Sequence, residues 1–305
     1  MTISIYKKVF LITLLIISMS CLNDTHKQEP NPHQISQASS STNGTTNLNI
    51  SLLLDLSDRI NPEKYPNPAM EYYQRDAAYI AAVSEAFQSH LSNKKIISIN
   101  ERIQLFFEPE PLNPEINSIS KNLKFDLNKT NISNDVLSNL SQVYQTEPLK
   151  IYELAIQDDH YVGSDTWSFF KNKVKDYSIA EGHRNILVIL TDGYMFHVDN
   201  RRTEGNKTTY LTPEYIRSVK LNSADWATKF KNDEYGFIPA TENLENLEVL
   251  VLGINPDQKN EYEGELIKKY WADWFEKMGV KRYEIKNAEL PSNMEKIIQD
   301  FILKA

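Results

Sequence analysis

The chain has 305 residues, of which 41% are hydrophobic and 24% charged, and its formal net charge is −8. This composition predicts a globular protein with a sizeable core. Cys21 is the only cysteine, so no internal disulfide can stabilise the fold. A negative chain is repelled by nucleic-acid phosphates, and we therefore expect no DNA or RNA partner.

The first predicted element is a secretion signal. Lys7 and Lys8 precede an apolar run, residues 9–17, which is too short to span a bilayer. Cys21 follows a small residue at the end of this segment, an order that resembles a bacterial lipobox, although Ser18 stands where an aliphatic residue is usual. The alternative is a plain signal peptide with an incidental cysteine. We predict a signal peptide over residues 1–20, lipid on Cys21 as the sole membrane attachment, and a place in the cell envelope, at the outer membrane or cell surface.

Residues 21–47 are polar and rich in Asn, Gln, Ser and Thr, which predicts a disordered tether. From residue 48 to residue 305, apolar strands alternate with amphipathic helices. We predict strands at 48–56, 102–107, 185–190, 247–254 and 280–285, with a short edge strand at 123–127. Helices are expected at about 73–91, 135–157, 167–174, 263–278 and 292–303, the second of them broken near Pro148. This order predicts an α/β domain with three layers, doubly wound around a mainly parallel sheet.

Two carboxylates follow strands of this predicted sheet. Asp55 ends the first strand beside Ser57, and Asp192 follows the strand at 185–190. A further loop with Asp165 and Thr166 precedes the helix at 167–174. Ligands bind at the carboxyl ends of parallel strands, and carboxylate and hydroxyl oxygens suit Mg²⁺, Mn²⁺ or Ca²⁺. Zinc is disfavoured, because neither free cysteines nor paired histidines are present.

The order of these motifs resembles the von Willebrand factor type A (vWA) family and its metal-ion-dependent adhesion site, over residues 47–305. The resemblance implies that Asp55, Ser57, Thr166 and Asp192 hold a divalent cation, Mg²⁺ foremost. It also implies a protein partner whose acidic residue completes the coordination shell. No bond is broken at such a site, so we expect no enzymatic activity.

One departure concerns the first motif, which in the family is Asp-x-Ser-x-Ser. Arg59 takes the place of the second serine, so a positive charge replaces a hydroxyl ligand. Asp58 can compensate by supplying a carboxylate, directly or through water, with Arg59 turned away from the ion to pair with an acid. Alternatively, the guanidinium fills the site, and the protein is a metal-free structural lipoprotein of the envelope.

A long insertion separates the strands at 185–190 and 247–254. Residues 194–241 are predicted to hold a hairpin, with 195–198 against 208–211, and then a helix carrying Tyr215, Trp226 and Phe230. Either the insertion sets binding specificity, or it covers an edge of the sheet.

Besides a metal-dependent binding protein and a metal-free structural lipoprotein, a third hypothesis is an enzyme. A Mg²⁺-dependent phosphohydrolase would use Asp55 and Asp192, but such enzymes of the haloacid dehalogenase type need Asp-x-Asp, and Ser57 stands at the second position. No phosphate-binding loop and no Gly-x-Ser-x-Gly motif occurs.

Overall fold

The computed structural model describes residues 46–161 and 163–304. The chain divides into two units, residues 1–43 and 44–305, and everything described below belongs to the second. The predicted signal peptide, Cys21 and residues 21–45 of the predicted tether lie outside the described residues.

The folded unit is built on a central sheet with the strand order β3-β2-β1-β4-β8-β9. All neighbours in it are parallel except β2 and β3. The strands are β1 (Asn47–Leu54), β2 (Asn100–Phe107), β3 (Lys124–Asn128), β4 (His183–Leu190), β8 (Leu247–Ile254) and β9 (Arg282–Asn287). The order reverses between β1 and β4, as in other doubly wound folds. The predicted fold class is therefore confirmed.

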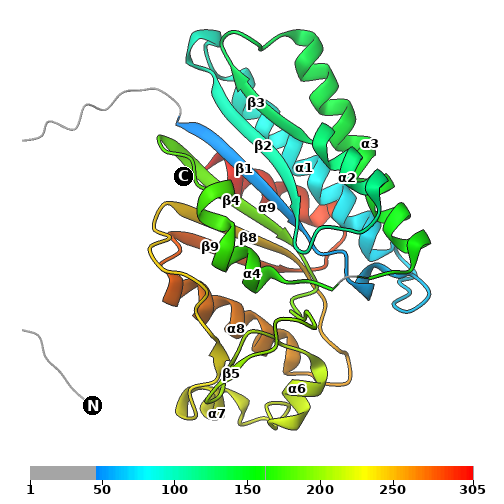
Figure 1. Cartoon of the computed structure of the whole chain (residues 1–305), viewed down its shortest axis with the longest axis vertical. Coiled ribbons are helices and arrows are strands. Elements are labelled where there is room, and N and C mark those ends of the chain that lie inside the picture. Colours follow the sequence, from blue (N-terminus) through cyan, green and yellow to red (C-terminus); the bar gives the residue numbers. More distant parts are fainter. Residues whose placement is uncertain (1–45, 162, 305) are drawn as a thin grey trace, which may run out of the picture. The chain divides into compact units, whose positions relative to one another are not determined.

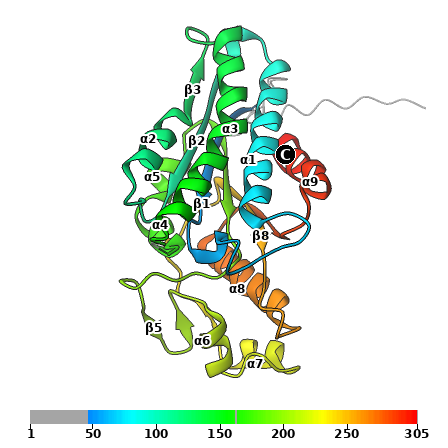
Figure 2. The same ribbon diagram turned by 90° about the vertical axis from the view of Figure 1, so that its right-hand side faces the viewer.

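Helices cover both faces of the sheet, because successive residues of a strand point to opposite sides. In β4, Ile186, Val188 and Leu190 face one core, while Leu187 and Ile189 face the other. The first face carries α1 (Tyr72–Ser92), α2 (Pro114–Asn122), α3 (Asn134–Asp158) and α9 (Pro291–Leu303). The second carries α4 (Thr166–Asn172), α5 (Val174–Ser178) and α8 (Glu263–Met278). Figure 2 shows α1 and α9 on one side of the strands, with α4 and α5 on the other.

The insertion packs over α8 rather than along the sheet edge (Figure 1). It contains β5 (Thr203–Glu204), β6 (Lys207–Thr208), α6 (Pro213–Ser218), α7 (Trp226–Asn232) and β7 (Gly236–Phe237). Phe237 lies among the aromatic rings of α8, 5.4 Å from Trp274 between ring centroids. The Trp274 indole also donates to the Ile238 carbonyl at 3.0 Å. The insertion therefore buries the aromatic face of α8.

Three sequence predictions need correction. The helix at 135–157 is not broken at Pro148, since α3 runs without interruption from Asn134 to Asp158. The hairpin pairs Thr203–Glu204 with Lys207–Thr208, and only an isolated bridge joins Met195 to Leu211. Two short helices, α6 and α7, replace the one expected after it.

At the amino-terminal edge of the sheet, a buried ion pair joins β4 to β8. Arg184 donates two hydrogen bonds to the Glu248 carboxylate, at 3.0 and 2.8 Å. Burial raises the pKa of Glu248, but the hydrogen bonds and charge of Arg184 outweigh it and hold the pKa below its ordinary value.

Within residues 46–161 and 163–304, no helix has the length and apolar content needed to traverse a bilayer.

Candidate functional site

The predicted site residues gather where β1 and β4 end side by side. Leu54 pairs with Leu190, so the residues that follow them, Asp55 and Thr191, leave the sheet at adjacent points. The Asp55 amide still donates to the Leu190 carbonyl at 3.0 Å. This is the point where the strand order reverses, which is where open α/β sheets bind ligands.

Asp55 is buried, and its carboxylate is held on all sides. Oδ1 accepts from the Ser57 amide at 2.8 Å, and Oδ2 accepts from the Thr191 hydroxyl at 2.9 Å. Oδ2 also lies 3.5 Å from Nε of Arg59. These contacts supply the charge and hydrogen bonds that a buried carboxylate needs.

Arg59 points into the protein from a short 3₁₀ turn, η1 (Asp58–Ile60), and its side chain is only 5% exposed. Nη2 donates to Asp76 of α1 at 2.5 Å and to the Leu190 carbonyl at 2.9 Å. Burial lowers the pKa of Arg59, but the charges of Asp76 and Asp55 outweigh it and raise the pKa above its ordinary value. One guanidinium thus serves two buried carboxylates.

The side chains in this arrangement do not fit a divalent cation beside Asp55. The charge that an ion would supply is already supplied by Arg59, whose guanidinium would repel an ion bound to the same oxygen. The carboxylates are satisfied by a side chain of the protein itself.

Asp192 differs from Asp55, because it has no cationic partner among the described residues. It is half-buried, and its Oδ1 accepts one hydrogen bond, from the Tyr194 amide at 3.0 Å. Burial and the nearby charge of Asp55 raise the pKa of Asp192 to about 7, although Arg59 acts in the opposite direction. Asp192 is the uncompensated acid of the site.

Gly193 fixes the course of the chain after Asp192. Its φ of +97° lies in the region that favours glycine. A Cβ at this position would lie 2.5 Å from Ile267 and 2.7 Å from Ile254. The Thr-Asp-Gly motif therefore needs glycine for packing as well as for backbone geometry.

The remaining predicted residues are spread around this centre. Ser57 is half-buried and lines the same cleft as Asp192, which is described below, and Asp58 pairs with Lys64. Asp165 caps α4 by accepting from the Ser168 amide at 3.0 Å. Thr166 is buried, and its hydroxyl lies 3.3 Å from that of Ser164.

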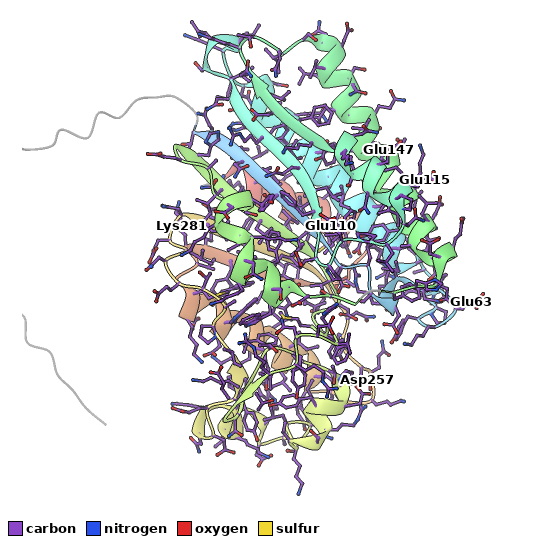
Figure 3. All side chains as sticks on the ribbon, viewed as in Figure 1. Glu63, Glu110, Glu115, Glu147, Asp257 and Lys281 are labelled. Carbon is purple, nitrogen blue, oxygen red and sulfur yellow. The ribbon has the colours of Figure 1, made fainter. Side chains whose placement is uncertain are left out.

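A cleft of about 1290 Å³ opens over the site. Residues of four segments line it: Ser57, Asp58, Arg59, Lys64, Tyr65, Pro66 and Tyr72; Asp159, Tyr161, Gly163 and Ser164; Asp192, Tyr194, Phe196, His197, Val198, Thr212, Pro213, Glu214, Arg217 and Asn222; and Gly253, Asn255, Pro256, Asp257, Gln258, Lys259 and Asn260. Figure 3 shows Glu63 and Asp257, from two of the loops that build this region, on the side opposite to Lys281. The insertion thus contributes to the cleft as well as covering α8.

Two residues of the buried network around Arg59, Asp76 and Tyr152, were not predicted from the sequence. Asp76 binds Arg59, and its Oδ2 also accepts from the Tyr152 hydroxyl of α3 at 3.2 Å. A signal for Asp76 was present, since it shares the apolar helix stripe of Ile80 and Val83. A carboxylate on a buried stripe requires a partner.

Neither a protein-family model nor a curated protein matches this chain. Solved structures that resemble it include an aerotolerance-related membrane protein from Bacteroides fragilis, with 12% identity and a TM-score of 0.37 over 85% of this chain and 100% of that one. BatB from Bacteroides thetaiotaomicron has 12% identity and a TM-score of 0.36, with the same coverage. The pilus adhesin SpaC from Lactobacillus rhamnosus GG has 11% identity and a TM-score of 0.40, over 86% of this chain and 30% of that one. Likenesses this distant say nothing of what the present chain binds.

Proposed function

We propose that this chain is a lipid-anchored protein of a bacterial cell envelope that binds a protein partner at the cleft without a divalent cation. The observation that carries the proposal is the buried Arg59, which pairs with Asp55 and Asp76 where the vWA resemblance would have an ion. The envelope location and lipid on Cys21 rest on the sequence of residues 1–21 alone.

The position of the cleft supports a binding role. It lies at the reversal point of the strand order, and four separate segments converge on it. Three side chains on its wall expose apolar surface, namely Tyr65, Phe196 and Val198. Exposed apolar groups rimmed by polar residues are typical of protein interaction sites.

Binding is favoured over hydrolysis because Asp55 is not free to act on a substrate. Its two oxygens are engaged by the Ser57 amide, the Thr191 hydroxyl and Arg59. A carboxylate nucleophile or metal ligand would have to give up these contacts. The phosphohydrolase alternative therefore has no support in this geometry.

Metal independence is tested by calorimetric titration of Mg²⁺, Mn²⁺ and Ca²⁺ into the full chain in a nonionic detergent. We expect no saturable binding to the natural sequence. Arg59→Ser restores the Asp-x-Ser-x-Ser pattern and should create a site, whereas Arg59→Leu removes the charge without adding a ligand and should not. Saturable binding to the natural chain that disappears in Asp192→Ala would contradict the proposal.

Partner binding is tested by photo-crosslinking in cells, with a benzophenone amino acid at Val198 on the cleft rim, which is 69% exposed. The matched control is Ile97, which is 76% exposed but lies in η2 (Ile96–Ser98), before β2. We expect a discrete adduct from position 198 only, with the same yield in EDTA as in Mg²⁺. Adducts from both positions, or from neither, would argue against the cleft.

A further inference from the structure

Carboxylates outnumber cationic groups where Asp192 meets the cleft. Three carboxylates, those of Asp55, Asp76 and Asp192, surround the single guanidinium of Arg59 and all act on its charge. Arg59 is committed to the first two through contacts at 3.5 and 2.5 Å. Asp192 is left without a counter-charge, and it faces the cleft.

The other basic side chains of the cleft do not supply the missing charge. Lys64 pairs with Asp58, and Arg217 bridges Glu214 and Asp257 at 2.8 and 3.3 Å. Lys259 is the one Lys or Arg among the described lining residues without a carboxylate partner, and it is exposed on the loop after β8. A ligand that reaches Asp192 therefore meets an acid that the described part of the protein leaves unpaired.

The cleft that Asp192 faces also offers apolar surface and one hydrogen-bonding atom without a partner among the described residues. Phe196 and Val198 are 40% and 69% exposed at the rim. The Tyr161 hydroxyl, also of the cleft lining, is buried and makes no hydrogen bond in the described structure, whereas His197 Nδ1 lies 3.8 Å from Oδ2 of Asp165. A buried hydroxyl without a partner is uncommon in native proteins and is expected to find one.

These features match one kind of side chain. Lys and Arg have an apolar stem that packs along hydrophobic surface and a cationic head that seeks a carboxylate. A guanidinium has five donors, more than a carboxylate alone can satisfy, so a neighbouring oxygen acceptor adds to its binding. An acidic group would instead be repelled by Asp192.

We propose that the partner inserts a basic side chain, Arg or Lys, into this cleft, where Asp192 pairs with it. The inference rests on the proposed function and adds the chemistry of the partner. The vWA resemblance implies a bound metal ion that is contacted by an acidic residue of the partner, so the proposed partner residue has the opposite charge. In this chain Arg59 supplies the positive charge that the ion would supply, and Asp192 is left to bind a basic side chain of the partner.

The experiment measures fluorescence anisotropy of labelled hexa-arginine and hexa-glutamate peptides with the full chain in nonionic detergent. Hexa-arginine should bind, and Asp192→Asn should weaken it about tenfold or more. The Asn amide can still accept from the Tyr194 amide, so this variant should fold, which circular dichroism verifies. Asp159→Asn is the matched control, because Asp159 is an exposed carboxylate of the same cleft, and its loss should change binding by no more than about threefold.

Two outcomes would overturn the inference. Equal weakening in both variants would show only the general attraction of an acidic protein for cations. Hexa-glutamate binding that requires Mg²⁺ would show that the site recognises an acidic group through a bound ion, as the vWA resemblance implies. In either case the crosslink from Val198 reports separately on whether the cleft binds a partner at all, so the inference can fail while the proposed function stands.

Discussion

Removing Arg59 should destabilise the fold strongly, because its guanidinium neutralises two buried carboxylates. The side chains of Asp55 and Asp76 are each 2% exposed, so water cannot replace the lost charge. Breaking a buried pair by removing one partner costs about 3–5 kcal/mol. For a domain of this size, each kcal/mol lowers the melting temperature by about 2–4 °C. Arg59→Leu should therefore melt roughly 10 °C below the natural chain.

The assay is urea and thermal unfolding of the full chain at pH 7, followed by circular dichroism. Arg217→Leu is the control, since Arg217 is 45% exposed and its ion pairs should contribute less than about 1 kcal/mol. Burial raises the pKa of Asp76, and loss of Arg59 removes the charge that opposes this rise. A group whose folded pKa is raised costs stability above that pKa, so the deficit of Arg59→Leu should shrink as the pH falls. A deficit below about 1 kcal/mol, or one that does not change with pH, would refute the reasoning.

Three further predictions concern the scaffold. Because the pKa of Glu248 is lowered, its ion pair with Arg184 stabilises the fold at pH values above the ordinary glutamate pKa, and this stabilisation is lost as the pH falls through the folded pKa. In Glu248→Gln, the free energy of unfolding should therefore depend less on pH in that range. An unchanged pH profile would contradict this. Gly193→Ala should lower the free energy of unfolding in urea by about 2 kcal/mol or more. Gly205→Ala, where the added Cβ meets open space, should lower it by no more than about 1 kcal/mol. Trp274→Ala should cost about 3–5 kcal/mol, and a loss below about 1 kcal/mol would mean that the insertion does not depend on α8.

The layout of the fold could be predicted from sequence where local patterns and tertiary packing agree. Helix α8 was predicted at its observed bounds, because its apolar stripe is strong and Gly279 ends it with a φ of +76°. Helix α2 was missed, although Asn113 and Pro114 form a typical start, with the Asn113 side chain accepting from the Glu115 amide at 2.8 Å. In the insertion, the strands are two residues long, too short for an alternating pattern to place their pairing.

The site itself was only half predictable. Asp55 and Asp192 were placed from their strands, because parallel strands bring their carboxyl ends to one edge. The direction of Arg59 could not be read from the motif, since it depends on Asp76, which lies 17 residues away on a helix. Charge neutralisation inside a fold is decided by such distant partners, and a short motif does not contain them.

The orientation of β1 has a mechanical consequence for the proposed attachment of the domain to a membrane. The chain enters the sheet at Asn47, and β1 carries it eight residues to the opposite edge, where Asp55 leads into Ser57, the first residue that lines the cleft. At about 3.3 Å per residue, this separates the entry point from the cleft by roughly 26 Å. Under the proposed function, a pull on the lipid-anchored N-terminal segment would load β1 lengthwise, from the end remote from the cleft. Strand β1, which lies between β2 and β4 in the sheet, would then transmit force between the proposed anchor and the cleft.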